Sequence, residues 1–178
     1  STKPNFQNIP IRTREGREIR KAFSAQKRGW KIFSADYSQV ELRIMAHFSE
    51  DEALIDAFNN EEDIHTRTAS LVFNVPVENV LSDMRRTAKI VNFGIMYGAG
   101  AFRLSQELGI PRNDATQIIA DYFKKYPGIQ EYINNTLEKA RNLKYVETIL
   151  GRRRPILEAN SSNALKRKAA ERMAINMP

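Results

Sequence analysis

Two cations and two aromatic residues recur every four residues in the segment 82–97. They are Arg85, Lys89, Phe93 and Tyr97. On an α-helix a step of four residues turns the chain by about 400°, so these side chains form one slowly winding stripe roughly 18 Å long. Arg and Lys bind phosphate oxygens by charge-assisted hydrogen bonds, and aromatic rings stack on bases. The stripe matches a nucleoside triphosphate, although an amphipathic helix with surface cations and half-buried rings has the same spacing.

A second periodicity in this segment predicts how the helix is anchored. Apolar side chains recur with the 3.6-residue period on another face and are expected to pack on the protein. Ser82 is predicted to cap the helix, with Asp83 in the first turn. The core-facing residues are Met84, Ala88, Val91 and Ile95.

A carboxylate, Asp36, ends the short apolar segment 31–36, which is predicted to be a strand, and a helix is predicted at 39–49. A strand end is a common position for a carboxylate that projects into a functional site. A role for Asp36 as a helix cap or turn residue explains the same pattern.

His65 stands in the first turn of another predicted helix, 63–73. A lone histidine is usually structural or solvent-exposed. His65 becomes a candidate phosphate ligand only if the fold brings it near Arg85 and Lys89. The spacing of the two histidines, His47 and His65, without any cysteine is not that of a zinc site.

Helical patterns account for most of the remaining chain, whereas residues 1–29 have little periodicity and are predicted to form an extended loop. A strand, a turn and a basic return strand are predicted after residue 144. The further predicted helices are 51–59, 101–108, 111–126, 127–143 and 162–176, and the strand is 145–150, followed by Arg152, Arg153 and Arg154.

Charge is strongly segregated along the 178 residues. Residues 1–31 hold nine Lys/Arg against two Glu, and residues 139–178 hold ten against three, so each end is +7. Residues 41–83 hold two Arg against ten Asp/Glu, which is −8. Basic ends suggest contact with a polyanion such as nucleic acid, although solvated charge is the commoner explanation.

Composition excludes several classes of protein. The chain has no cysteine, so neither disulfides nor thiolate metal sites are expected. No apolar run approaches the roughly 18 residues of a membrane span, and no signal peptide is visible. There is no complete dinucleotide or P-loop glycine pattern. We expect a cytoplasmic, monomeric protein with no membrane partner.

Six segments, taken together, resemble family A DNA polymerases, the bacterial DNA polymerase I group. The segment 36–43 resembles motif A, and 85–97 resembles motif B, the O helix of the fingers. The resemblance covers essentially the whole chain, with the motifs in the order of the family. The other segments are Pro4-Asn-Phe-Gln-Asn-Ile-Pro10, Asp63-Ile-His65, Gly151-Arg-Arg153 and Ala170-Glu-Arg-Met-Ala-Ile-Asn-Met-Pro178.

The resemblance implies template-directed DNA synthesis from deoxynucleoside triphosphates on a primer–template, in DNA replication and repair. It implies that Asp36 and the carbonyl of Tyr37 bind two Mg²⁺ ions and that Lys89 also donates a proton to pyrophosphate. It also implies that Glu41 excludes a 2′-hydroxyl and that Phe93 discriminates against dideoxynucleotides. The implied dNTP ligands are Glu41, His65, Arg85, Lys89, Phe93 and Tyr97, and the implied DNA contacts are Asn5, Gln7, Asn8, Arg172 and Asn176.

The expected fold is α+β and predominantly helical, with a helical fingers subdomain and a few strands of an incomplete palm near Asp36. The expected divisions are 1–49 as part of the palm with motif A, 50–155 as fingers with the helix 82–97, and 156–178 as a helix returning towards the palm.

One departure from the family pattern matters for activity. The family takes its second catalytic carboxylate from a His-Asp-Glu turn, and neither histidine here is followed by Asp-Glu. We therefore expect an inactive fragment of a polymerase. Two alternatives are a non-catalytic helical module that binds nucleic acid and a small complete nucleotidyltransferase. The latter would need a carboxylate from Asp51, Asp56 or Asp63.

Overall fold

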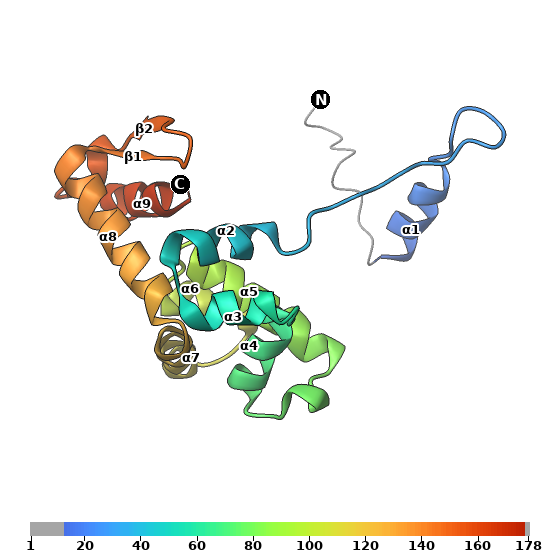
Figure 1. Cartoon of the computed structure of the whole chain (residues 1–178), viewed down its shortest axis with the longest axis horizontal. Helices are drawn as coiled ribbons and strands as arrows, with labels where there is room; N and C mark the ends of the chain where they lie inside the picture. The colour runs from blue at the N-terminus through green and yellow to red at the C-terminus, as the bar shows by residue number, and fades with distance from the viewer. Residues whose placement is uncertain (1–12, 177–178) are drawn as a thin grey trace. The chain divides into compact units, whose positions relative to one another are not determined.

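The computed structural model describes residues 13–176 and divides the chain into two compact units, 1–38 and 39–178 (Figure 1). The first unit contains helix α1 (Arg14–Lys21), which the sequence pattern did not predict. Thr13 caps it, because the Thr13 side chain accepts a hydrogen bond of 3.0 Å from the Gly16 N–H. This cap is a local signal in a segment too short and polar to show a clear apolar period.

The predicted strand at 31–36 is wrong, because these residues form neither helix nor strand in the structure. A strand requires a partner to pair its backbone N–H and C=O groups. No described segment pairs with 31–36, so its apolar residues alone are insufficient to form a strand. The predicted palm strands near Asp36 are therefore not present in the described part of the chain.

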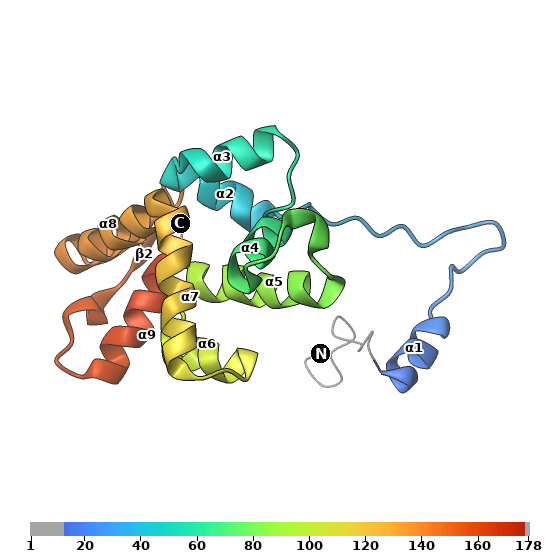
Figure 2. The same cartoon turned by 90° about the horizontal axis from the view of Figure 1, so that it is seen from below.

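The second unit is built from helices, which confirms the predominantly helical fold (Figures 1 and 2). Most bounds agree with the sequence patterns to within two residues. Helix α4 packs along α5, and the two lie side by side in both views. The elements are α2 (Val40–Ser49), α3 (Glu52–Asn59), α4 (Ile64–Phe73), η2 (Val77–Asn79), α5 (Ser82–Met96), α6 (Ala101–Leu108), α7 (Arg112–Lys125), α8 (Pro127–Leu143), η3 (Leu157–Asn160) and α9 (Ala164–Ile175).

Helix ends show where local signals decide the structure. Pro127 starts α8, as proline's fixed φ and missing N–H favour. The prediction that Ser82 caps α5 is wrong, since Leu81 is the cap residue and makes no side-chain cap hydrogen bond. Asp63 caps α4 by accepting a 2.8 Å hydrogen bond from the Thr66 N–H.

A two-stranded antiparallel hairpin follows α8. Strand β1 (Tyr145–Glu147) pairs with β2 (Arg153–Pro155), with Tyr145 opposite Pro155. The first strand is shorter than the predicted 145–150, because the chain turns at 148–151, where the N–H of Gly151 donates to Thr148. Gly151 has a φ of +78°, which favours glycine.

Two hydrophobic clusters form the core of the second unit. The larger one joins α2 to α8 and includes Leu42, Leu54 and Val91. The smaller one lies among the end of α8, β1, η3 and α9, and Leu137 of α8 packs against both clusters. Helix α8 therefore joins the hairpin and α9 to the remaining helices.

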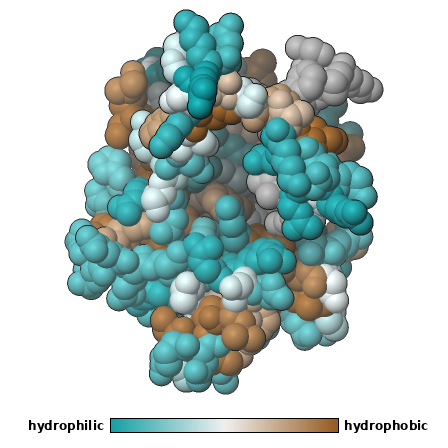
Figure 3. All heavy atoms as spheres, turned by 90° about the vertical axis from the view of Figure 1, so that its right-hand side faces the viewer, coloured by the Kyte–Doolittle hydropathy of each residue, from teal (hydrophilic) through white to brown (hydrophobic). Residues whose placement is uncertain are grey.

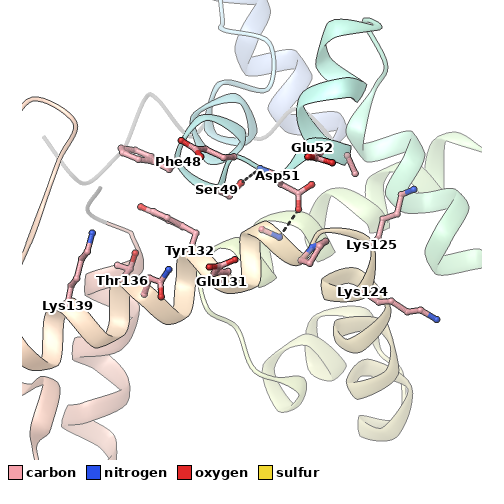
Figure 4. A pocket seen from close by; sticks show the side chains of 15 residues that line it. Phe48, Ser49, Asp51, Glu52, Lys124, Lys125, Glu131, Tyr132, Thr136 and Lys139 are labelled. Atoms are coloured by element: carbon pink, nitrogen blue, oxygen red, sulfur yellow. Dashed lines mark hydrogen bonds between the residues drawn. The ribbon is translucent and has the colours of Figure 1, made fainter.

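Asp51 connects the start of α3 to the start of α8 (Figure 4). One of its carboxylate oxygens accepts from the Leu54 N–H at 3.0 Å and the other accepts from the Gly128 N–H at 2.9 Å. A Cβ at Gly128 would lie 2.9 Å from the Ser49 carbonyl oxygen, so only glycine allows this close approach. The surrounding cavity of about 830 Å³ does not include the stripe residues of α5.

Many large apolar side chains remain exposed in the described part of the chain. Phe33 and Leu150 are 89% and 92% exposed. Hydrophobic groups interrupt a mostly hydrophilic surface on the face shown in Figure 3. Extended exposed apolar surface commonly marks contact with another part of a protein or with a partner. None of the described helices is both long and apolar enough to span a membrane.

Two neighbouring buried tyrosines allow a matched test of the core. Within residues 13–176 the Tyr122 hydroxyl has no hydrogen-bond partner, whereas the Tyr126 hydroxyl shares one with Thr68. We expect Tyr122→Phe to leave the free energy of unfolding unchanged or higher, since a buried unpaired hydroxyl costs about 1–3 kcal/mol. Tyr126→Phe should lower it by about 1 kcal/mol. Urea unfolding measures both, and equal losses would show that the Tyr122 hydroxyl is paired.

Candidate functional site

Helix α5 presents the four stripe residues as one row, and contacts along it join Lys89, Phe93 and Tyr97. The Phe93 and Tyr97 rings stack with their centroids 5.9 Å apart, and the Lys89 Nζ lies 5.6 Å from the Phe93 ring centroid. Tyr97 is the residue that ends the helix, and its N–H donates to the Phe93 carbonyl. On the opposite face Val91 and Ile95 are buried, as their spacing predicts.

Arg85, at the cationic end of the row, is held by Asp63. The guanidinium donates two hydrogen bonds to one Asp63 oxygen, at 2.6 Å from Nη2 and 3.2 Å from Nε. Partial burial opposes ionisation of Asp63, but hydrogen bonds from Arg85 and Thr66 outweigh it and lower the pKa of the carboxyl. The carboxylate that caps α4 thus also orients the first cation of α5.

His65 lies beside this row, as the family pattern implied. Its ring centroid is 5.7 Å from that of Phe93, and the residue is 3% exposed. Burial is the largest cause of its lowered pKa, and the charges of Arg85 and Lys89 lower it further against the opposing effect of Asp63 and Glu41. The imidazole is therefore mostly neutral at pH 7.

Glu41 lies near the aromatic end of the row. It lines a cavity of about 150 Å³ together with Tyr97 and Asn176. Burial raises the pKa of the Tyr97 hydroxyl, and the charge of Glu41 raises it further. The structure therefore brings together three predicted site residues from α2, α5 and the end of α9.

Arg172 reaches the same end of α5 from α9. It lines a cavity of about 470 Å³ with Gly98 and Phe102, just after Tyr97. The Asn176 N–H donates to the Arg172 carbonyl at 3.1 Å, so the two residues lie one helical turn apart. The basic side chain of Arg172 and the amide of Asn176 thus border the loop that follows Tyr97.

Asp36 and Tyr37 are exposed residues of the first unit, whereas α5 belongs to the second. A carboxylate and a backbone carbonyl are oxygen donors of the kind that Mg²⁺ prefers. Residues 13–176 contain no group of three or more His, Asp or Glu arranged to hold a metal ion. Asp36 would therefore supply one ligand of a metal site and would need further ligands beside it. The predicted DNA contacts Asn5, Gln7 and Asn8 lie outside the described residues.

Sequence reasoning missed several residues that position the site. Gln39 has a left-handed φ of 52°, and its side-chain oxygen accepts from the Ile64 N–H at 3.2 Å, which ties α2 to α4. Asn92 and Thr68 are fully buried polar residues beside His65. The available signal was an asparagine at the core-facing position between Val91 and Ile95, where a polar residue needs a partner.

Comparison with known proteins gives consistent results over the whole chain. The model of the family described as DNA polymerase family A matches residues 1–178. DNA polymerase I of Pseudomonas aeruginosa is 51% identical over 178 residues, which are 100% of this chain and 19% of that protein. The thermostable DNA polymerase I of Thermus thermophilus is 52% identical, with 100% and 21% covered. The chain thus spans about a fifth of the length of these relatives.

A solved structure shows the same fold. It is described as the POL domain of Pol1 from M. smegmatis in complex with DNA primer-template and dNTP. Its TM-score to this chain is 0.88 at 45% identity, and the match covers 100% of this chain and 31% of that one. With a family match along its entire length, the chain belongs to DNA polymerase family A.

Proposed function

We propose that this chain forms the dNTP-binding part of a DNA-directed DNA polymerase, which transfers a nucleotidyl group from a dNTP to a primer 3′-hydroxyl. The row on α5 with His65 beside it carries the proposal. It presents cations at one end and stacked rings at the other. This polarity matches a triphosphate joined to a base. The family supports this chemistry, and its polymerases are metal-dependent.

The cationic end would bind the triphosphate. Arg85 and Lys89 supply charge-assisted donors, and His65 supplies a neutral N–H donor. Asp63 holds Arg85 through Nη2 and Nε, which leaves Nη1 able to donate to a phosphate oxygen. Lys89 is also proposed to donate a proton to the leaving pyrophosphate, since an ammonium near the scissile bond can neutralise its developing charge.

The aromatic end would receive the base and sugar. Phe93 offers its ring to the incoming nucleotide, and Tyr97 lies where the templating base is expected. Glu41, near Tyr97, would occupy the space that a 2′-hydroxyl requires. Arg172 and Asn176 would contact the primer–template from its minor-groove side. The M. smegmatis structure, a complex with DNA primer-template and dNTP, supports these partners.

Asp36 and the Tyr37 carbonyl are proposed as ligands for two Mg²⁺ ions, which would neutralise charge on the attacking and leaving oxygens. The second carboxylate of the family pattern comes from a His-Asp-Glu turn, and neither His47 nor His65 precedes Asp-Glu. We therefore propose that these 178 residues bind dNTP but need a further carboxylate for catalysis.

The remaining assignments follow from the same family. We propose that residues 1–49 belong to the palm, 50–155 to the fingers and 156–178 to a helix that returns towards the palm. A bacterial polymerase that acts on chromosomal DNA would work in the cytoplasm, and we propose that it does so as a monomer.

Nucleotide binding tests the proposed role of α5. Lys89→Ala should weaken dNTP binding by about ten- to a hundredfold, because it removes a charge-assisted hydrogen bond to phosphate. Lys124→Ala is the matched control, since it removes the same charge from an exposed residue. Lys124 lines the cavity around Asp51, which does not include the stripe residues of α5. Equilibrium titration with a fluorescent dNTP measures both. Equal affinities of the two variants would contradict the proposed role of Lys89.

Primer extension tests the need for a further carboxylate. The 178-residue chain should not extend a primer in Mg²⁺, and extension that Asp36→Ala abolishes would contradict this expectation. A non-catalytic nucleic-acid-binding module would behave differently: its DNA binding would fall with salt but be indifferent to Mg²⁺ and to Lys89→Ala. That pattern, with no dNTP binding, would favour the alternative function.

A further inference from the structure

A chain of buried hydrogen bonds runs from Tyr126, between α7 and α8, to Thr68 of α4, then to Asn92 of α5, and ends at His65 of α4. Tyr126 is hydrogen-bonded to Thr68, the Thr68 hydroxyl is 3.0 Å from the Asn92 Oδ1, and the Asn92 Nδ2 is 3.0 Å from the His65 Nδ1. Thr68 and Asn92 are completely buried, and Tyr126 and His65 are 1% and 3% exposed. Buried polar groups of this kind are constrained in orientation, because no water replaces a lost partner.

The direction of these hydrogen bonds determines which His65 nitrogen carries the proton. The Thr68 hydroxyl donates to the Asn92 oxygen, so the Asn92 NH₂ group faces His65. An amide nitrogen only donates, and the His65 Nδ1 must therefore accept. A neutral imidazole that accepts at Nδ1 carries its hydrogen on Nε2. The opposite orientation of the Asn92 amide would instead require the hydrogen on Nδ1.

Nε2 remains available to a ligand. Among residues 13–176 the His65 Nε2 has no hydrogen-bond partner. It is not among the fully buried side-chain atoms without a partner, of which these residues contain only the Tyr122 hydroxyl. The His65 residue as a whole is 3% exposed. Phe93 packs beside the ring, and Arg85 and Lys89 lie close enough for their charges to affect it.

We propose that Asn92, oriented by Thr68, is a positioning residue that holds His65 in the Nε2–H form, so that His65 donates a hydrogen bond to a triphosphate oxygen. This inference rests on the proposed dNTP binding. Phosphate oxygens only accept hydrogen bonds, so the other tautomer would turn a lone pair towards them. Because His65 is mostly neutral, the tautomer decides whether this side chain attracts or repels the phosphate.

The first test reads the tautomer without a nucleotide. The ¹⁵N chemical shifts of the His65 ring nitrogens, measured near pH 8, should show hydrogen on Nε2 in the wild-type chain. Asn92→Asp has nearly the same shape but accepts hydrogen bonds, so it should move the hydrogen to Nδ1. Thr68→Val should allow the amide to reorient and populate both forms. Thr136→Val, another buried threonine, is the control and should change nothing.

The second test connects the tautomer to binding. Asn92→Asp should weaken dNTP binding by about tenfold or more. In a His65→Gln background, where the side chain donates without a tautomer, Asn92→Asp should weaken binding clearly less, because only the effect of its added negative charge remains. A merely structural role of Asn92 would weaken binding equally in both backgrounds and would overturn the proposal.

The outcomes separate this inference from the proposed function. Hydrogen on Nδ1 in the wild type, or an unchanged tautomer in Asn92→Asp, would overturn the role of Asn92. If the wild type shows the expected tautomer but does not bind dNTP, the proposed function is overturned. The role of His65 as a hydrogen-bond donor to phosphate is then overturned with it. Circular dichroism would verify folding, and if Asn92→Asp does not fold, the wild-type and Thr68→Val tautomers still decide the question.

Discussion

The packing of α4 against α5 is the constraint on which the candidate site depends. At one end, Asp63 caps α4 and binds Arg85 of α5. In the interior, Thr68 of α4 and Asn92 of α5 are hydrogen-bonded, with both side chains fully buried. A shift of either helix would break both interactions, and the loss of a buried partner costs about 1–3 kcal/mol. These polar contacts therefore determine the register of the two helices, which apolar packing alone specifies less strictly.

The same polar contacts give the site its electrostatic character. Asp63 offsets part of the positive charge of Arg85 and Lys89, and this permits His65 to lie beside the two cations. Burial keeps the His65 imidazole mostly neutral. A site built in this way combines charged and neutral donors along one row. A polyanion with several phosphate oxygens gains from both kinds, since charge supplies attraction and a neutral donor adds direction without further repulsion among cations.

Much of the helical architecture was predictable because its signals are local. Pro127 begins α8 and Asp63 caps α4, and both are decided by residues within one turn. The four-residue spacing on α5 also predicted one row of cations and rings. Residues 31–36 show the opposite case, because their apolar composition predicted a strand and no described segment pairs with them. The hydrogen-bond partner of His65 was equally beyond prediction, since Asn92 comes from a separate helix.

The sequence by itself determined the family, most helix bounds and the order of Arg85, Lys89, Phe93 and Tyr97 along one face. These properties depend on neighbours a few residues apart, so local spacing contains them. Only the tertiary structure decided that Asp63 holds Arg85, that Asn92 faces the Nδ1 of His65, and that Glu41 and Asn176 line one cavity with Tyr97. Those contacts join residues 22 to 135 positions apart in the chain. They depend on how whole helices pack, and no periodicity within a single helix encodes that packing.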